Sequence, residues 1–200
     1  MLLHSANTLV TPSGNRIGPN ALIQTINALR EFYIESQIAS MLRQSNQDYL
    51  LHQSPQEMIE EGEFDRLALN LCDHIGVMPT RKVLQRSGEL TADYLLAHRI
   101  PKPFQELLKV LPRQLALRLL FMSMSQNAWT FIGSGEFTYD MSGHMPVVKI
   151  TSDFASMEAA CGFFGGTFEH LIRKLIDTRV SVRYILELDQ KYCQYVIHYS

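Results

Sequence analysis

The stretch SMEAACGFFGGTFEHLIRKLI (residues 156–176) decides the fold of this chain. Its apolar residues recur at the three- and four-residue spacing of a helix with one wide buried face: Ala160, Phe163, Phe164, Phe168, Leu171, Ile172, Leu175 and Ile176. Gly165 and Gly166 stand in the middle of this helix, and each costs about 1 kcal/mol relative to alanine. We expect such a glycine pair where a strand, another helix or a flat ligand comes close to the helix backbone.

Segments with a two-residue period flank the helix on both sides. Before it, the alternation predicts a strand from Trp129 to Tyr139, a turn at 141–143 and a second strand over 146–151. After it, residues 180–187 and 193–199 alternate in the same way around a turn at 189–191. The sequence therefore predicts an α+β fold, in which amino-terminal helices precede an antiparallel four-stranded sheet of order β-β-α-β-β with one central crossing helix.

Residues 18–126 carry helical periods separated by glycine and proline. We predict helices over 19–33, 38–42, 63–74, 79–100, 104–111 and 112–126, with a bend at 87–88. A further helix is predicted to begin at Pro55 behind a Ser54 cap, with Gly62 dividing it from the next. Residues 1–17 are expected to form an irregular arm, and the ligand-binding unit 127–200 is expected to pack with helices 18–126 as one globular domain.

Composition excludes several classes of protein. The net charge of −2 and the dispersed basic residues give no general attraction to nucleic acid. The three cysteines are widely separated, so we expect reduced thiols in a cytoplasmic protein. Residues 1–7 lack the pattern of a signal peptide, and the longest apolar run, 115–124, is interrupted by Arg118 and is too short to cross a membrane.

Cofactor motifs that would mark a self-sufficient reductase are missing from the sequence. There is no GxGxxG after a strand, no GxxxxGK[ST], no GxSxG, no HExxH and no CxxC. A dinucleotide site, a P-loop and an iron–sulfur cluster are therefore not supported by these residues.

The candidate ligand-binding residues are a histidine with its helix neighbour, a set of aromatic residues and the glycine pair. His98 shares a helix face with Tyr94, and it either points into a pocket as a metal ligand or hydrogen-bond donor, or caps the end of its helix. Trp129, Phe163 and Phe164 either form walls for a planar ligand or fill the core, which is the commoner outcome. Gly165 and Gly166 would allow the ligand to approach closely.

Five segments of the chain resemble one family. RIGPNAL (16–22), TADYLLAHRIP (91–101) and AWTFIGSGEF (128–137) resemble the bacteriochlorophyll-pathway 4-vinyl reductase family, which acts on divinyl protochlorophyllide at its 8-vinyl group. CGFFGGTFEHLIRKLI (161–176) and YCQYVI (192–197) resemble its carboxy-terminal vinyl-reductase domain. The wider superfamily resembles small-molecule sensors and heme–nitric-oxide-binding modules, which hold apolar ligands between helices and an antiparallel sheet.

The resemblance implies a magnesium tetrapyrrole as ligand, either a magnesium porphyrin or divinyl protochlorophyllide. Our leading hypothesis is a tetrapyrrole-binding accessory or carrier protein of bacteriochlorophyll synthesis. One alternative is an 8-vinyl reductase that uses an external electron donor, and another is a small-molecule sensor or scaffold. Magnesium chelatase subunits, methyltransferase subunits and a second copy of the chain are the candidate protein partners.

Sensor relatives also imply a zinc site at the central helix and the last hairpin. Cys161 and Cys193 match its outer positions, but the intervening cysteine is absent and Glu187 falls out of register. A fourth ligand would have to come from His170 or His198, since zinc takes four ligands. We therefore expect the two cysteines to be buried as small apolar residues and no zinc to bind.

Overall fold

The computed structural model describes residues 14–187, 189 and 191–199. The elements run in the order β1 (Arg16–Ile17), α1 (Asn20–Phe32), α2 (Glu35–Gln44), the 3-10 helix η1 (Asp48–Leu51), β2 (Ile59–Glu60), α3 (Glu61–Ile75), α4 (Val77–His98), α5 (Lys102–Val110), α6 (Arg113–Gln126), α7 (Trp129–Ile132), β3 (Glu136–Asp140), β4 (Val147–Thr151), α8 (Met157–Leu175), β5 (Ser181–Glu187) and β6 (Tyr192–His198). The α+β fold with an antiparallel four-stranded sheet is confirmed.

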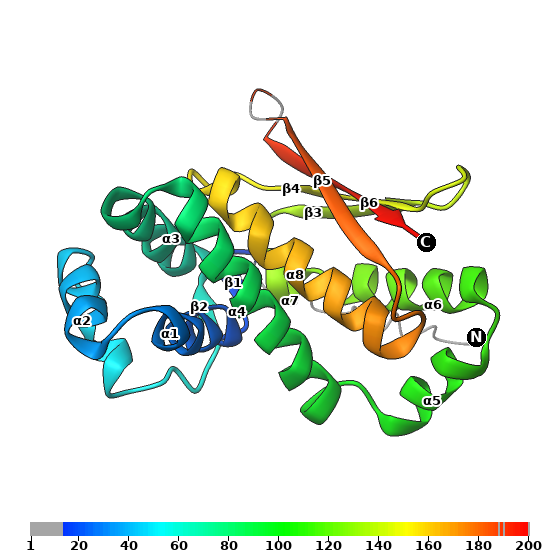
Figure 1. The fold of residues 1–200 in the computed structure, drawn as a ribbon, viewed down its shortest axis with the longest axis horizontal. Coiled ribbons are helices and arrows are strands. Elements are labelled where there is room, and N and C mark those ends of the chain that lie inside the picture. The colour runs from blue at the N-terminus through cyan, green and yellow to red at the C-terminus, as the bar shows by residue number, and fades with distance from the viewer. Residues whose placement is uncertain (1–13, 188, 190, 200) are drawn as a thin grey trace, which may run out of the picture.

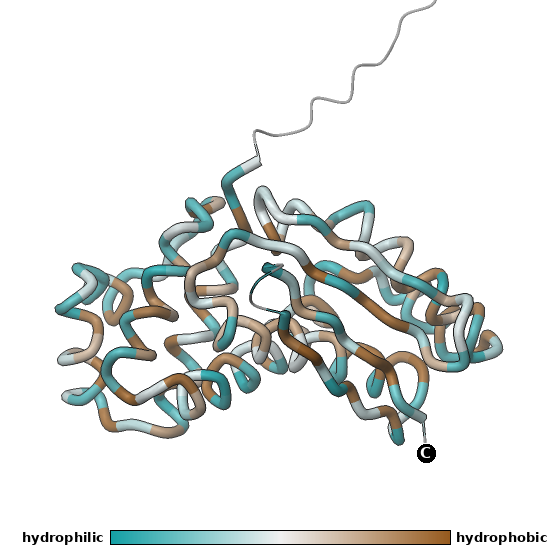
Figure 2. Tube along the Cα trace, turned by 90° about the horizontal axis from the view of Figure 1, so that it is seen from above, coloured by the Kyte–Doolittle hydropathy of each residue, from teal (hydrophilic) through white to brown (hydrophobic). Residues whose placement is uncertain are grey.

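Helix α8 is the central element, as its sequence predicts. It lies along α4 on one side and beneath the sheet on the other (Figure 1). Fourteen of its nineteen residues are buried, because it has protein on both sides. Figure 1 shows α1 to α3 on one side of the molecule and the sheet, α5 and α6 toward the other, with α4 and α8 between them, and Figure 2 shows the same molecule from above.

The sheet has the strand order β3-β4-β6-β5, and every neighbouring pair is antiparallel. Each hairpin therefore supplies one edge strand and one central strand. Val148 of β4 pairs with Tyr195 of β6, and Ile150 pairs with Cys193, so these four fully buried side chains face α8. The residues between them, such as Lys149 and Gln194, point to the opposite face.

The first strand is shorter than its two-residue period predicts. Trp129–Ile132 forms the short helix α7, and β3 begins only at Glu136. Gly133 between them has a φ of +68°, which interrupts an extended chain and favours glycine. The predicted strand is thus wrong over residues 129–135. Aromatic residues and glycines alternate there with the two-residue period of a strand, but the segment forms a helix and a turn.

The amino-terminal half corrects three further predictions. No helix begins at Pro55, since Ile59 instead pairs with Ile17 in a two-stranded ladder that starts inside the expected irregular arm. Gly62 lies within α3 and does not divide two helices. Helix α4 runs unbroken through Gly88. Residues 1–13 of the expected arm lie outside the described residues.

Two carboxylates of α3 accept hydrogen bonds from residues that lie just before β3 and just before α8. Asp65 accepts hydrogen bonds from the backbone N–H groups of Ala155 (3.1 Å) and Ser156 (2.9 Å), and so holds the two residues that precede α8. Glu61 accepts from the N–H and the hydroxyl of Ser134 at 2.7 and 2.6 Å, which fixes the turn after Gly133. Within the described ranges, no helix has both the length and the apolar character needed to span a membrane.

Candidate functional site

Helices α4 and α8 touch through glycine. A Cβ atom at Gly166 would overlap the carbonyl oxygen of Gln85, one at Gly162 would overlap that of Arg81, and one at Gly88 on α4 would overlap that of Phe163. The backbones of the two helices are therefore in direct contact. The sequence predicted that a strand, another helix or a flat ligand lies close to Gly166. In the structure, the close neighbour is helix α4. A ligand contact at Gly166 stays a prediction.

The predicted aromatic walls lie in the core. Phe163 and Phe164 are 3% and 1% exposed, and their ring centroids are 5.5 Å apart. Phe163 also packs against Phe64 of α3 at 5.3 Å. Gly165 faces the sheet, where a Cβ atom would lie 3.4 Å from the ring of Tyr195. In the structure these residues pack against protein, and their role toward a ligand remains a prediction.

His98 and Tyr94 form a separate pair at the other end of α4. His98 is the last residue of the helix and is exposed, and its ring centroid lies 4.8 Å from that of Tyr94. Trp129, on α7, is 41% exposed. Of the ring contacts found in the described part of the chain, none joins Trp129 to His98 or to the Phe163–Phe164 pair. The seven predicted residues are thus distributed over three places.

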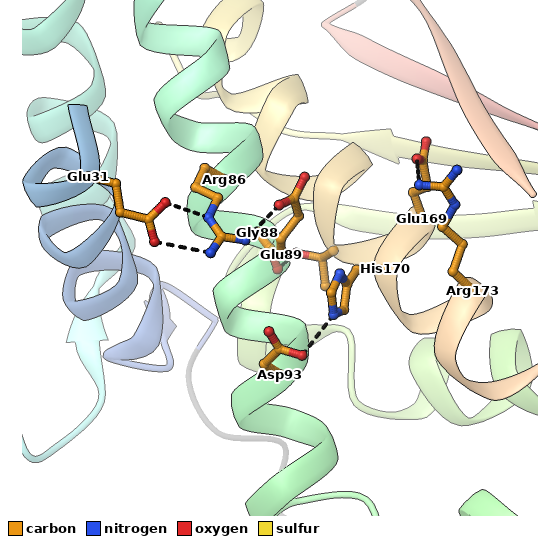
Figure 3. Close-up of polar contacts among 9 residues, drawn as sticks. Glu31, Arg86, Gly88, Glu89, Asp93, Glu169, His170 and Arg173 are labelled. Atoms are coloured by element: carbon orange, nitrogen blue, oxygen red, sulfur yellow. Dashed lines mark hydrogen bonds and ion pairs between the residues drawn. The ribbon is translucent and has the colours of Figure 1, made fainter. Parts of the chain in front are cut away.

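A polar row that the sequence did not reveal runs across α1, α4 and α8 (Figure 3). Arg86 of α4 donates to the Glu31 carboxylate of α1 at 2.7 and 3.0 Å and to Glu89 at 2.9 Å. The hydrogen bonds from Arg86 lower the pKa of Glu31, and the two carboxylates raise the pKa of Arg86. This row holds α1 against α4 at the molecular surface.

Asp93 and His170 extend the row onto α8, where they point toward each other (Figure 3). The His170 Nε2 atom lies 2.7 Å from a carboxylate oxygen of Asp93. A carboxylate at this distance fixes the orientation of the imidazole ring. Asp93 and His170 both lie in segments that carry the family resemblance, and this is the signal by which the sequence could have indicated the pair. From the sequence, His170 is named only as a possible zinc ligand.

The two cysteines considered for zinc meet in the core instead. Cys161 of α8 and Cys193 of β6 are fully buried, and the hydroxyl of Tyr195 donates to the Cys161 carbonyl oxygen at 3.2 Å. Contact with Cys193 and burial raise the pKa of the Cys161 thiol, and burial raises the pKa of Tyr195. Glu187 is exposed at the end of β5, opposite Tyr192. No three metal-ligating side chains (His, Cys, Asp or Glu) come together in the described ranges.

This arrangement predicts which thiol reacts in the native protein. Cys72 is partly exposed, whereas Cys161 and Cys193 are fully buried. We expect a chromogenic thiol reagent to modify Cys72 alone, and slowly, because burial raises the pKa of its thiol as well. In guanidinium chloride all three thiols should react, and a Cys72→Ser variant should show no native reactivity. Rapid reaction of a second thiol in the folded protein would contradict the placement of the buried pair.

Helix α6 has an exposed apolar face that was not predicted from the sequence. Its buried residues are Ala116, Leu117, Leu120 and Phe121. On the opposite side, Leu115 and Met122 are 50% and 42% exposed, with Arg118 exposed and Leu119 partly buried between them. Residues 115, 118, 119 and 122 share one helix face by their spacing. We call these four residues the α6 face. A helix that is apolar on both sides is typical of one that contacts something beyond its own core.

The α6 face belongs to a larger group of exposed apolar side chains. Five of the twelve large apolar residues that are exposed in the described chain lie between 107 and 129: Leu107, Val110, Leu115, Met122 and Trp129. Helix α5, which carries two of them, directly follows the His98 end of α4 and is held there by Gln105, whose amide donates to the carbonyls of Leu96 and Ile100 at 2.7 and 2.8 Å. Exposed apolar surface, three of the predicted site residues (Tyr94, His98 and Trp129) and the α6 face thus occur within α4 to α7.

Comparison with known proteins found relatives over most of the chain. It is 30% identical over 175 residues to the bacteriochlorophyll synthase 23 kDa chain of Cereibacter sphaeroides, covering 84% of this chain and 82% of that protein. The protein of the same name from Rhodobacter capsulatus is 30% identical over 189 residues, covering 92% and 87%. No family model matches the chain.

The fold is similar to that of H-NOX proteins. The Fe(II) unliganded H-NOX protein from K. algicida superposes with a TM-score of 0.60 at 13% identity, covering 92% of this chain and 97% of that one. A structure from a study of heme distortion in the H-NOX family gives a TM-score of 0.59 at 13% identity, covering 91% and 94%. At these identities the likeness shows a shared fold.

Proposed function

The chain belongs to the family of the bacteriochlorophyll synthase 23 kDa chain, and from this we propose that it binds a magnesium tetrapyrrole as an accessory protein of bacteriochlorophyll synthesis. One observation carries the proposal: a member of a bacteriochlorophyll-pathway family shares, over nearly its whole length, the fold of proteins studied for their heme. Heme and the magnesium intermediates of this pathway are both planar, largely apolar tetrapyrroles. A shared fold together with a similar ligand shape supports a tetrapyrrole-binding protein over a scaffold that acts through protein contacts alone.

In this proposal the ligand surface lies within the segment from the end of α4 to α7, which carries His98, the α6 face and Trp129. The glycine contacts of α8 are filled by α4, so the macrocycle lies instead against the α6 face, with Trp129 as a further aromatic surface. His98 is exposed, and among the described residues Tyr94 is its ring neighbour. Unlike His170, His98 has no carboxylate partner among the described residues, and it is the residue that would hold the magnesium.

Titration of the purified full-length protein with magnesium protoporphyrin IX tests the proposal. We expect saturable one-to-one binding with a dissociation constant on the order of micromolar or below, seen as a shift of the Soret band. A His98→Ala variant should bind more weakly and show a different band position. His52, which is also exposed and directly follows η1, provides the matched control, and His52→Ala should bind as the wild type. Absence of saturable binding to the wild type would overturn the proposal.

We further propose that the protein carries its ligand without reducing it. Reduction of a vinyl group needs a hydride or electron pair positioned at the alkene, and the sequence contains no motif for a nucleotide or an iron–sulfur cluster. The assay offers divinyl protochlorophyllide with NADPH, flavin and reduced ferredoxin in turn and follows the product by chromatography. Binding without monovinyl product supports the carrier, and catalytic turnover with any one donor supports the reductase instead.

A further inference from the structure

Arg118 is a cation placed in the middle of an apolar helix face. Leu115 precedes it by three residues, Met122 follows it by four, and Leu119 is adjacent. Its side chain is exposed and has no hydrogen bond or ion pair with any of the described residues. An arginine usually rests its stem on apolar surface and directs the guanidinium toward an anion or water.

Several other arginines of the chain already have partners in the structure. Arg113, at the start of the same helix, lies 3.9 Å above the ring of Tyr199 and 3.6 Å from a carboxylate oxygen of Asp177. Arg81 and Arg86 are each paired with glutamates. Arg118 differs from these in having no partner in the described chain. Arg43 of α2 likewise has no partner among the described residues, but Arg118 has apolar neighbours on its own helix face.

The stretch of sequence around Arg118 carries more basic than acidic residues. Residues 102–126 contain four basic residues and one acidic residue, in a chain whose net charge is −2. The single acid, Glu106, is bound to Lys109 at 2.8 Å. Helix α6 itself contains no acidic residue. The face is therefore complementary to a molecule that is flat and apolar over most of its area and carries a carboxylate.

We propose that Arg118 binds a propionate carboxylate of the tetrapyrrole that lies on the α6 face, so that the protein selects intermediates with a free propionate over fully esterified ones. This inference rests on the proposed function and deepens it by naming the class of ligand. Two parallel N–H to oxygen hydrogen bonds from a guanidinium to a carboxylate give both strength and orientation. The apolar macrocycle beside the pair displaces water and strengthens the interaction further.

The test compares two ligands that share one macrocycle and differ in their propionate groups. Magnesium protoporphyrin IX has two free propionates, and its dimethyl ester has none. For the diacid, we expect Arg118→Gln to weaken binding about tenfold, equivalent to about 1.4 kcal/mol. For the diester, the same variant should bind as the wild type does. Arg118→Lys should retain part of the diacid affinity, because it keeps the charge without the planar fork.

Arg43→Gln is the matched control, since Arg43 is also exposed and unpaired in the described chain but lies on a polar face of α2. Thermal unfolding of each variant confirms that it is folded. Equal losses for diacid and diester, or no loss for either, would overturn the role of Arg118 while leaving the proposed function intact. If the wild type binds neither ligand, the proposed function fails, and this inference fails with it.

Discussion

Replacing Gly166 with alanine is expected to destabilise the protein by about 1–3 kcal/mol, because the added Cβ overpacks a close helix contact. In an ordinary helix the same change would stabilise by up to about 1 kcal/mol. Here the new atom would overlap the backbone carbonyl of Gln85, and a backbone in the middle of α4 cannot move aside as a flexible side chain can. Gly166→Leu should destabilise still more strongly.

Denaturant unfolding followed by circular dichroism measures this effect, and Gly62 supplies the control. Gly62 lies in α3, is exposed, and would place a Cβ atom with nothing within 4 Å. Gly62→Ala should therefore stabilise the protein, by up to about 1 kcal/mol. If Gly166→Ala also stabilised it, α4 and α8 would not be in backbone contact in solution.

Tyr195→Ala is expected to cause the larger loss, about 3–5 kcal/mol, as for other buried aromatic residues. Tyr195 is completely buried between sheet and helix, and its ring centroid lies 5.1 Å from that of Phe168. Tyr195→Phe keeps the ring and removes only the hydroxyl hydrogen bond to the Cys161 carbonyl, so it should lose about 1 kcal/mol.

Tyr192 on the same strand provides the comparison, because it is only partly buried and its ring lies beneath the ammonium group of Lys149 at 3.7 Å. Tyr192→Ala should lose less than about 1 kcal/mol, which is the range of an exposed cation–π contact. Similar losses from Tyr192→Ala and Tyr195→Ala would show that the sheet does not bury the face assigned to α8.

The helices and strands predicted best are those whose hydrophobic period, within their own residues, determines their secondary structure. Helix α8 and strands β4, β5 and β6 have periods that hold over their full length, and the α8 face with the most apolar residues is the buried one. The segment 129–135 failed because its shape depends on a distant residue. The carboxylate of Glu61 holds Ser134, and no local period reports a contact between residues 73 positions apart.

The site was harder to predict than the fold, for a related reason. An aromatic residue or glycine on a helix has the same spacing whether it contacts protein or ligand, so Phe163 and Gly166 could not be assigned to either from the sequence. The apolar run of α6 was considered only as a membrane segment, whereas its meaning depends on how much of it the core leaves exposed. Arg118 then appears as an interruption in the sequence and as the centre of a face in the structure.

The contact between α4 and α8 also determines the order in which the chain can fold. The residues that meet across it are far apart in sequence: Arg81 and Glu158 are separated by 77 positions, and Gly88 and Thr167 by 79. During synthesis α4 is complete long before α8 exists, so its glycine-bearing side has no partner until residues 157–175 have been made. Closing so long a loop is an entropic barrier, and it comes before most of the core can form. We therefore expect folding to be completed only after α8 has been synthesised, with docking of α8 as the step that joins the amino-terminal helices to the sheet.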